Sequence, residues 1–144
     1  MVSQGVYADG PMKAYSGGAG LVSTDSNYTK LLLMLLNQGT LNGTKILSPS
    51  SVVLMTSDQI PCIDMPLDRI DAFGHDFALT TGNEGDLKGN TIQYEWAGAY
   101  NSKYYVRPED GVIVVYLTQL RPTNGLKDWE EINAAIKIAL GIKP

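Results

Sequence analysis

Three segments of strand length follow one another between residues 91 and 119, separated by short connections. Residues 91–100 alternate large apolar and polar side chains, which is the period of a strand with one buried face. Residues 103–107 and 112–119 form the next pair, with Pro108 and Gly111 placed where a chain reversal favours these residue types. Because short connections join antiparallel neighbours, the pattern predicts an antiparallel meander.

Two further segments set the expected extent of this sheet. Residues 75–81 also have the length of a strand, which brings the expected number of strands to between three and five. Residues 112–117 are almost uniformly apolar, a pattern typical of a strand that is covered on both faces. We therefore expect residues 112–117 to form a central strand of the sheet.

A leucine-rich segment, residues 25–38, precedes the predicted sheet. Ser23 and Thr24 can accept hydrogen bonds from the first free amides of a helix, and Gly39 can adopt the left-handed conformation of a helix end. Apolar side chains surround this predicted helix almost completely, so it needs cover on several sides. Such cover is scarce in 144 residues, which is a first indication that the native protein contains more chain.

Two other helix signals complete the predicted fold. Ser48 followed by Pro49 predicts a short helix that ends near residue 57. Its expected buried side chains are Val52, Val53 and Met55. Near the carboxy terminus, an apolar stripe at helical spacing should lie on the sheet; it consists of Trp129, Ile132, Ile136 and Leu140. We predict an α+β fold in which an antiparallel sheet of three to five strands packs against a carboxy-terminal helix, with two further helices.

Glycine and proline residues divide the chain into two unequal parts. They recur throughout residues 1–22 and predict an irregular lead-in there. The ordered domain is therefore expected to cover residues 23–144.

Charge and residue content exclude several classes of function. The net charge is −4 and no Lys/Arg cluster occurs, so we expect no nucleic acid partner. One cysteine, Cys62, excludes an intrachain disulfide, and one histidine, His75, leaves too few ligands for a structural zinc site. The loop acids have no calcium-binding spacing; they are Asp64, Asp68, Asp71 and Asp76. We expect no metal ion or other cofactor.

The compartment is not indicated by the sequence. No apolar run approaches the roughly 18 residues that a membrane span needs, so we expect no such span. Residues 1–5 have neither the basic flank nor the hydrophobic stretch of a signal peptide.

The stretch Trp96-Ala97-Gly98-Ala99 carries the most functional information. Three small residues interrupt a strand whose alternate positions are bulky. Small side chains on a strand let a ligand approach the backbone, and exposed amides there can donate to a carbonyl oxygen that develops negative charge. A bulge, or close packing of another strand, explains the same residues without a function. Both interpretations stay open at this point.

Five short motifs occur in a recognisable order. They are residues 16–24, 37–43, 46–49, 96–99 and 114–119, which read SGGAGLVST, NQGTLNG, ILSP, WAGA and VVYLTQ. Their order and spacing resemble the serine beta-lactamase-related family of class C beta-lactamases, DD-peptidases and related esterases. The resemblance covers about residues 14–140. It implies the carboxy-terminal part of a beta-lactamase/transpeptidase-like, penicillin-binding fold.

The resemblance also implies a site. The third active-site motif of the family is Lys-Thr-Gly, or His/Trp-x-Gly in esterase-like members, and Trp96-Ala97-Gly98 is similar to the second form. By position, Ala99 would supply one backbone amide of the oxyanion hole, and Trp96, Ala97 and Gly98 would contact the substrate. Tryptophan carries no positive charge, so the resemblance favours an esterase-like or peptidase-like substrate over one recognised by its carboxylate, such as a penicillin.

The two other family motifs are absent. No serine or threonine has a lysine at the third following position, so the nucleophile motif Ser-x-x-Lys is missing, and neither Tyr-x-Asn nor Ser-x-Asn occurs. Both motifs lie nearer the amino terminus in the family. We therefore interpret the chain as the carboxy-terminal fragment of a serine hydrolase, inactive alone.

This interpretation implies particular partners. They are the missing amino-terminal part and, in the full protein, a small ester, amide or peptide substrate. The alternative is a non-catalytic binding or assembly module that reuses the same half-fold, with self-association or a partner covering its apolar surfaces. Members of the family are often exported or periplasmic, but this chain carries no signal of it.

Overall fold

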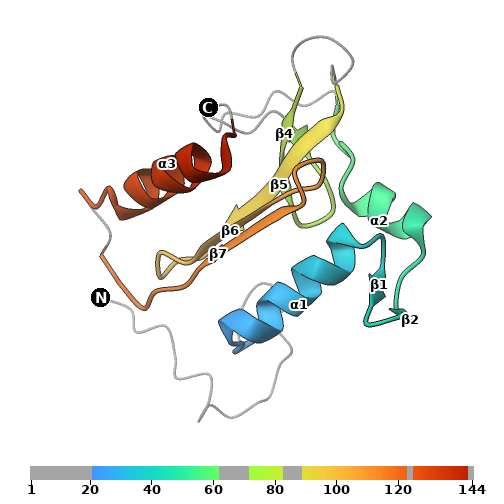
Figure 1. Cartoon of the computed structure of the whole chain (residues 1–144), viewed down its shortest axis with the longest axis horizontal. Helices are drawn as coiled ribbons and strands as arrows, with labels where there is room; N and C mark the ends of the chain where they lie inside the picture. Colours follow the sequence, from blue (N-terminus) through green and yellow to red (C-terminus); the bar gives the residue numbers. More distant parts are fainter. Residues whose placement is uncertain (1–20, 62–71, 83–88, 123–124, 143–144) are drawn as a thin grey trace.

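In the computed structural model, which describes residues 21–61, 72–82, 89–122 and 125–142, an antiparallel sheet lies between helices (Figure 1). The helices are α1 (Asp25–Leu36), α2 (Pro49–Met55) and α3 (Asp128–Leu140). The large sheet consists of β3 (Ala72–Phe73), β4 (Ala78–Thr81), β5 (Thr91–Ala97), β6 (Lys103–Arg107) and β7 (Val112–Tyr116). A separate hairpin consists of β1 (Thr40–Leu41) and β2 (Thr44–Lys45). The predicted α+β fold is confirmed.

The large sheet is a meander, because its spatial order β3-β4-β5-β6-β7 is also its chain order and every neighbouring pair is antiparallel. Among the described strands, β7 is the last in this order, so the prediction that residues 112–117 form a central strand is wrong. Val115 packs against the core on the α1 side, and the ring of Tyr116 lies 5.7 Å from that of Trp129 on α3. The apolar run thus reflects two covered faces rather than two neighbouring strands.

The hydrophobic core lies between α1, α2 and one face of the sheet. Its buried residues are Leu32, Met34, Leu35, Val52, Ala72, Phe77, Leu79, Tyr94 and Val106. Fully burying one such large apolar side chain contributes about 1.5–3 kcal/mol to folding. Tyr28, on the first turn of α1, packs against this core, so the same burial that fixes the helix brings its amino-terminal end to the sheet.

The first strand region differs from the expectation. Residues 75–81 were expected to form one strand, but β4 begins at Ala78 and the short strand β3 precedes it. His75 and Asp76 instead form the exposed turn between β3 and β4, where Asp76 has a left-handed backbone with φ 67°. The His75 amide donates to the Met55 carbonyl oxygen at the end of α2. This amide is therefore not available for a hydrogen bond to a neighbouring strand.

The helices bury less than their patterns predicted. Val52 is buried and Met55 partly so, but Val53 is 57% exposed, because the seven-residue helix α2 packs with one side only. On α3, no side chain is fully buried, and Ile132 and Leu140 remain exposed. The predicted stripe therefore covers the sheet mainly through Trp129, whose ring contacts those of Tyr105 and Tyr116.

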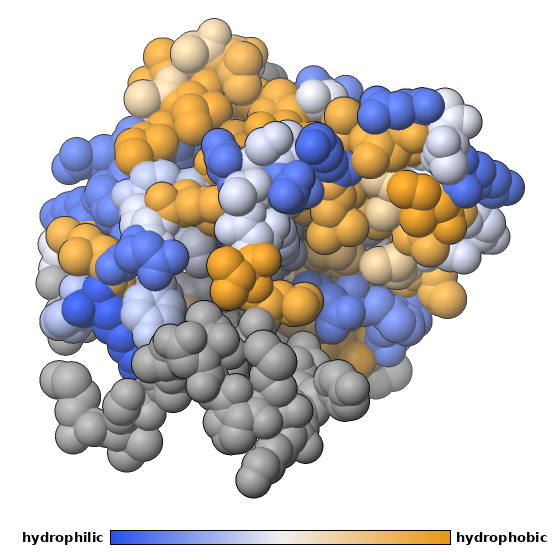
Figure 2. All heavy atoms as spheres, turned by 90° about the horizontal axis from the view of Figure 1, so that it is seen from below, coloured by the Kyte–Doolittle hydropathy of each residue, from blue (hydrophilic) through white to orange (hydrophobic). Residues whose placement is uncertain are grey.

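Exposed apolar side chains also occur on elements other than α3. Figure 2 shows the molecule from below, with several separate orange areas among polar residues rather than one continuous apolar surface. On α1, on α2 and in the segment that follows β2 they include Leu31, Leu33, Ile46, Val53 and Leu54. As expected from the many apolar residues of α1, the described chain covers that helix incompletely.

Several residues singled out from the sequence lie outside the described part of the chain. Cys62, Asp64, Asp68 and Asp71 lie outside the described residues, as does nearly all of the predicted lead-in, residues 1–22. Within the described ranges, no helix combines the length and the apolar character needed to cross a bilayer.

Candidate active site

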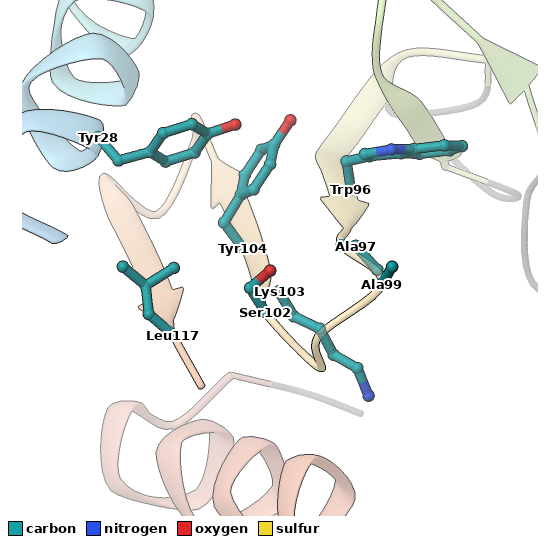
Figure 3. A pocket seen from close by; sticks show the side chains of 9 residues that line it. Tyr28, Trp96, Ala97, Ala99, Ser102, Lys103, Tyr104 and Leu117 are labelled. Carbon is teal, nitrogen blue, oxygen red and sulfur yellow. The ribbon is translucent and has the colours of Figure 1, made fainter. Parts of the chain in front are cut away.

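A pocket of about 350 Å³ opens where β5 ends (Figure 3). Its lining comes from α1, the end of β5, the β5–β6 turn, the start of β6 and the segment after β7. The residues are Tyr28, Trp96, Ala97, Gly98, Ala99, Ser102, Lys103, Tyr104 and Leu117. All four site residues named from the sequence, Trp96 to Ala99, therefore line one pocket together.

The small residues lie where the chain turns. Strand β5 ends at Ala97, earlier than the expected residue 100, and the Gly98 amide donates to the Ser102 carbonyl oxygen at 2.7 Å to begin the turn into β6. A Cβ atom at Gly98 would lie within 3.0 Å of the Ser102 hydroxyl oxygen. A side chain at Gly98 would therefore require Ser102 to change its rotamer, and Ala97, Gly98 and Ala99 are all exposed at the pocket.

Aromatic rings form much of the pocket wall. Trp96 and Tyr104 are directly paired across β5 and β6, so both rings project from the same face of the sheet. Tyr28 reaches them from α1, and its ring centroid lies 5.1 Å from that of Tyr104. Trp96 is 45% exposed and meets Phe73 edge to face, with 5.4 Å between ring centroids. Figure 3 shows the Tyr28 and Tyr104 rings beside each other and Trp96 across from them.

The hydroxyl of Tyr104 is a donor rather than a base. Burial raises the pKa of this phenol far above its usual range, and a hydrogen bond with Tyr28 raises it further. Burial also raises the pKa of the nearby core residue Tyr94 to about 12. Tyr104 is therefore protonated at neutral pH, and its hydroxyl does not serve as a base there.

No positive charge is directed into the pocket by the residues that line it. Lys103 is the one lysine or arginine among them. Its side chain leaves on the opposite face of the sheet, where Nζ lies 5.4 Å from the ring centroid of Trp129 on α3. Figure 3 shows this side chain extending toward α3 and away from Tyr104.

Hydrogen bonds at two residues, Tyr100 and Asn101, hold the turn that carries Ala99. The Tyr100 carbonyl oxygen accepts hydrogen bonds from the Thr118 hydroxyl at 2.6 Å and from the Leu120 amide at 3.3 Å. The Asn101 side-chain amide donates to the Asp128 carboxylate at 2.9 Å.

Asp128 accepts a second hydrogen bond on the same oxygen. Its donor is the Tyr116 hydroxyl, at 2.5 Å. The bond from Tyr116, followed by those from the Trp129 amide and Asn101, lowers the pKa of Asp128, while the same bond raises the pKa of Tyr116. The carboxylate is therefore charged at neutral pH.

Several of these residues were not found by sequence reasoning. Tyr104 could have been inferred, because it is the large residue opposite Trp96 once the hairpin is placed in register. Tyr28 and Leu117 had no comparable signal, since helix packing and the path of the chain after β7 bring them to the pocket. In the described ranges, no group of three or more His, Cys, Asp or Glu side chains could hold a metal ion.

One family model covers most of the chain. The sequence model of the family described as Beta-lactamase matches residues 2–137. Two Mycobacterium tuberculosis proteins, Protein Rv1367c of strain H37Rv and an uncharacterised protein of strain CDC 1551, are each 29% identical over 123 residues, 78% of this chain. The chain spans only 31% of the length of each.

A solved structure shares the fold. It is the crystal structure of a candidate beta-lactamase from Bacteroides dorei DSM 17855, with a TM-score of 0.66 and 18% identity. The match covers 90% of this chain and 45% of the solved one.

Proposed function

The chain belongs to the beta-lactamase family, and on this basis we propose that it supplies the last active-site strand and the oxyanion-binding side of a serine hydrolase site. The observation that carries the proposal is the pocket at the end of β5, which Trp96, Ala97, Gly98 and Ala99 line together. The backbone amide of Ala99 acts as one donor to the oxygen that becomes negative when the substrate carbonyl is attacked. The other three residues contact the substrate.

The nucleophile is proposed to come from a companion segment. No serine or threonine of the chain stands three positions before a lysine, so no hydroxyl has the helical neighbour that accepts its proton in Ser-x-x-Lys. One oxyanion donor contributes about 10²–10³ in rate when a nucleophile attacks, but without a nucleophile there is no attack for it to assist. The chain alone is therefore inactive.

Turnover by the isolated chain tests this proposal. We expect no hydrolysis of nitrocefin or 4-nitrophenyl acetate above that of a heat-denatured sample. The informative control is Ser102→Ala, because Ser102 has the one serine hydroxyl that lines the pocket. Burst kinetics with the unchanged chain that disappear in Ser102→Ala would show a nucleophile inside the chain and contradict the proposal.

The substrate of the complete site is proposed to be uncharged at the end that faces Trp96. The lining is largely aromatic and apolar, and Lys103, its one cation, is directed to the other face. An ester or peptide carbonyl with a neutral neighbouring group fits this lining better than a substrate held by its carboxylate.

Replacing Trp96 by lysine should change this preference. The unchanged chain is expected to bind methyl phenylacetate more tightly than phenylacetate, measured by NMR shifts of the Gly98 and Ala99 amides. Trp96→Lys should shift the ratio toward the anion by up to about fivefold, the usual value of one exposed ion pair. The matched control is Lys103→Gln, which removes a charge that lies over Trp129 and should leave the ratio unchanged. Equal binding of both ligands by the unchanged chain would contradict the proposed substrate class.

One observation fits the alternative of a non-catalytic assembly module as well as it fits a missing segment. Ile46, which follows β2, and Val53 and Leu54 on α2 are each more than half exposed. Such apolar surface is typical of a contact with another chain or segment. If the module is correct, light scattering should show self-association that Val53→Glu with Leu54→Glu abolishes, and no companion segment should restore hydrolysis.

A further inference from the structure

One carboxylate joins the turn of the pocket to the opposite side of the sheet. Asp128 is the first residue of α3, and its Oδ2 atom accepts hydrogen bonds from the Asn101 side chain at 2.9 Å and from the Tyr116 hydroxyl at 2.5 Å. Asn101 belongs to the β5–β6 turn and Tyr116 is the last residue of β7. Three elements that are distant in the sequence therefore meet at one oxygen atom.

Asn101 is the residue on which this contact acts. Its side chain is only 7% exposed, and its backbone is left-handed, with φ 63°. A buried polar side chain is costly without a partner, and a hydrogen bond to a charged acceptor is about twice as strong as one between neutral groups. The bond to Asp128 therefore stabilises both the burial of Asn101 and the turn conformation that its backbone requires.

Ala99 lies in the part of the turn that this contact restrains. Before it, the Gly98 amide is bonded to the Ser102 carbonyl oxygen. After it, the Tyr100 carbonyl oxygen is held by Thr118 and Leu120, and Asn101 is held by Asp128. Hydrogen bonds thus hold both flanks of Ala99 and restrain the backbone between them.

We propose that Asp128 is a positioning residue, which holds the Ala99 amide at the pocket by fixing Asn101. It does not touch the substrate. The inference rests on the proposed oxyanion role of Ala99, yet the positioning itself can be measured without any turnover. A purely structural role in α3 makes a different prediction, because an acidic residue in the first turn stabilises a helix through its dipole wherever it lies in that turn.

Two variants and two matched controls separate these roles. Asp128→Ala removes the acceptor, and Asn101→Gly removes the donor while keeping a residue that tolerates positive φ. Glu130→Ala removes another acid of the first turn of α3, and Asn42→Gly makes the same change at an exposed turn with φ 50°. Asp128→Asn serves as the rescue, since it keeps an oxygen acceptor at the same place.

The measurement is NMR relaxation of the Ala99 amide in the full chain. We expect Asp128→Ala and Asn101→Gly each to lower its order parameter from about 0.85 to below about 0.6. The exchange rate of the Leu120 amide should rise about tenfold with them, the effect of losing one hydrogen bond. Both controls and Asp128→Asn should stay close to the unchanged chain. The double variant should move Ala99 no further than either single one, because the two changes break the same bond.

Three results would overturn the inference. They are an unchanged Ala99 amide in both variants, an equal change in Glu130→Ala, and a change that spreads over all amides of β5, β6 and β7. Hydrolysis in the assembled enzyme is a separate measurement: if Asp128→Ala loosens Ala99 but leaves kcat unchanged, the positioning stands and the oxyanion role of Ala99 is wrong.

Discussion

Hydrolysis of 4-nitrophenyl esters should rise at least a thousandfold when the chain is combined with the companion segment that the proposed function requires, which carries Ser-x-x-Lys. The expected size follows from serine hydrolases in general, where removing the nucleophile or its base costs about 10⁶ in kcat and leaves about 10³–10⁴ over water. Steady-state assays of the two parts, alone and together, measure the gain.

Two variants show whether this chain contributes chemistry or only folding to the restored enzyme. Ala99→Pro removes the backbone amide and should reduce kcat by about 10²–10³ with little change in KM, as loss of one oxyanion donor does. Ala99→Gly keeps the amide and is the matched control, with an expected loss of less than about tenfold. Full activity of Ala99→Pro would contradict the oxyanion role, and absence of any gain on mixing would contradict the proposed hydrolase.

The part of the site that could be predicted is the part that is continuous in the sequence. Trp96 to Ala99 follow one another, and the change from bulky to small side chains is visible without a structure. Tyr28 and Leu117 lie 68 and 21 positions from Trp96, and only the packing of α1 and the path of the chain after β7 bring them to the same pocket. No local pattern encodes such meetings, because they depend on how whole elements pack.

The contact between Asp128 and Asn101 was missed for a related reason. Asp128 reads as an ordinary acid in the first turn of a helix, which dipole and capping arguments already explain. Its second role depends on where the helix lies on the sheet. Asn101 has no distinguishing neighbour in the sequence either, and its left-handed backbone becomes evident only from the turn that it forms.

Strand periods predicted the sheet better than they predicted its edges. The pairings of β5, β6 and β7 agree with the expected hairpins, since alternation and turn residues act locally. The position of β7 did not follow, because an apolar run reports how many faces are covered and not how many strands lie beside it. The side chains of α3 were likewise expected to be more buried. In the structure, the ring contacts between α3 and the sheet are made by one residue, Trp129.

Gly39→Ala should destabilise the chain by about 2–5 kcal/mol. The Gly39 backbone has φ 90°, and its amide donates to the Met34 carbonyl oxygen at the end of α1. A Cβ atom at this position would lie within 3.0 Å of the Leu47 carbonyl oxygen. The left-handed conformation costs a residue with a side chain about 1–2 kcal/mol, and forcing an atom into packed structure adds about 1–3 kcal/mol. Urea denaturation followed by circular dichroism measures the loss.

Gly43→Ala is the matched control for this prediction. Gly43 lies in the neighbouring β1–β2 turn with φ 79°, but a Cβ atom there would meet no non-neighbouring atom within 4 Å. Only the conformational cost applies there, so the loss should be about 1–2 kcal/mol. The difference between the two variants isolates the approach of Gly39 to Leu47, by which the hairpin holds the end of α1. Equal losses would mean that the contact relaxes freely.

The amino-terminal end of the same helix carries Tyr28 to the pocket, so Gly39→Ala should also broaden the NMR signals of the Tyr28 ring, whereas Gly43→Ala should not.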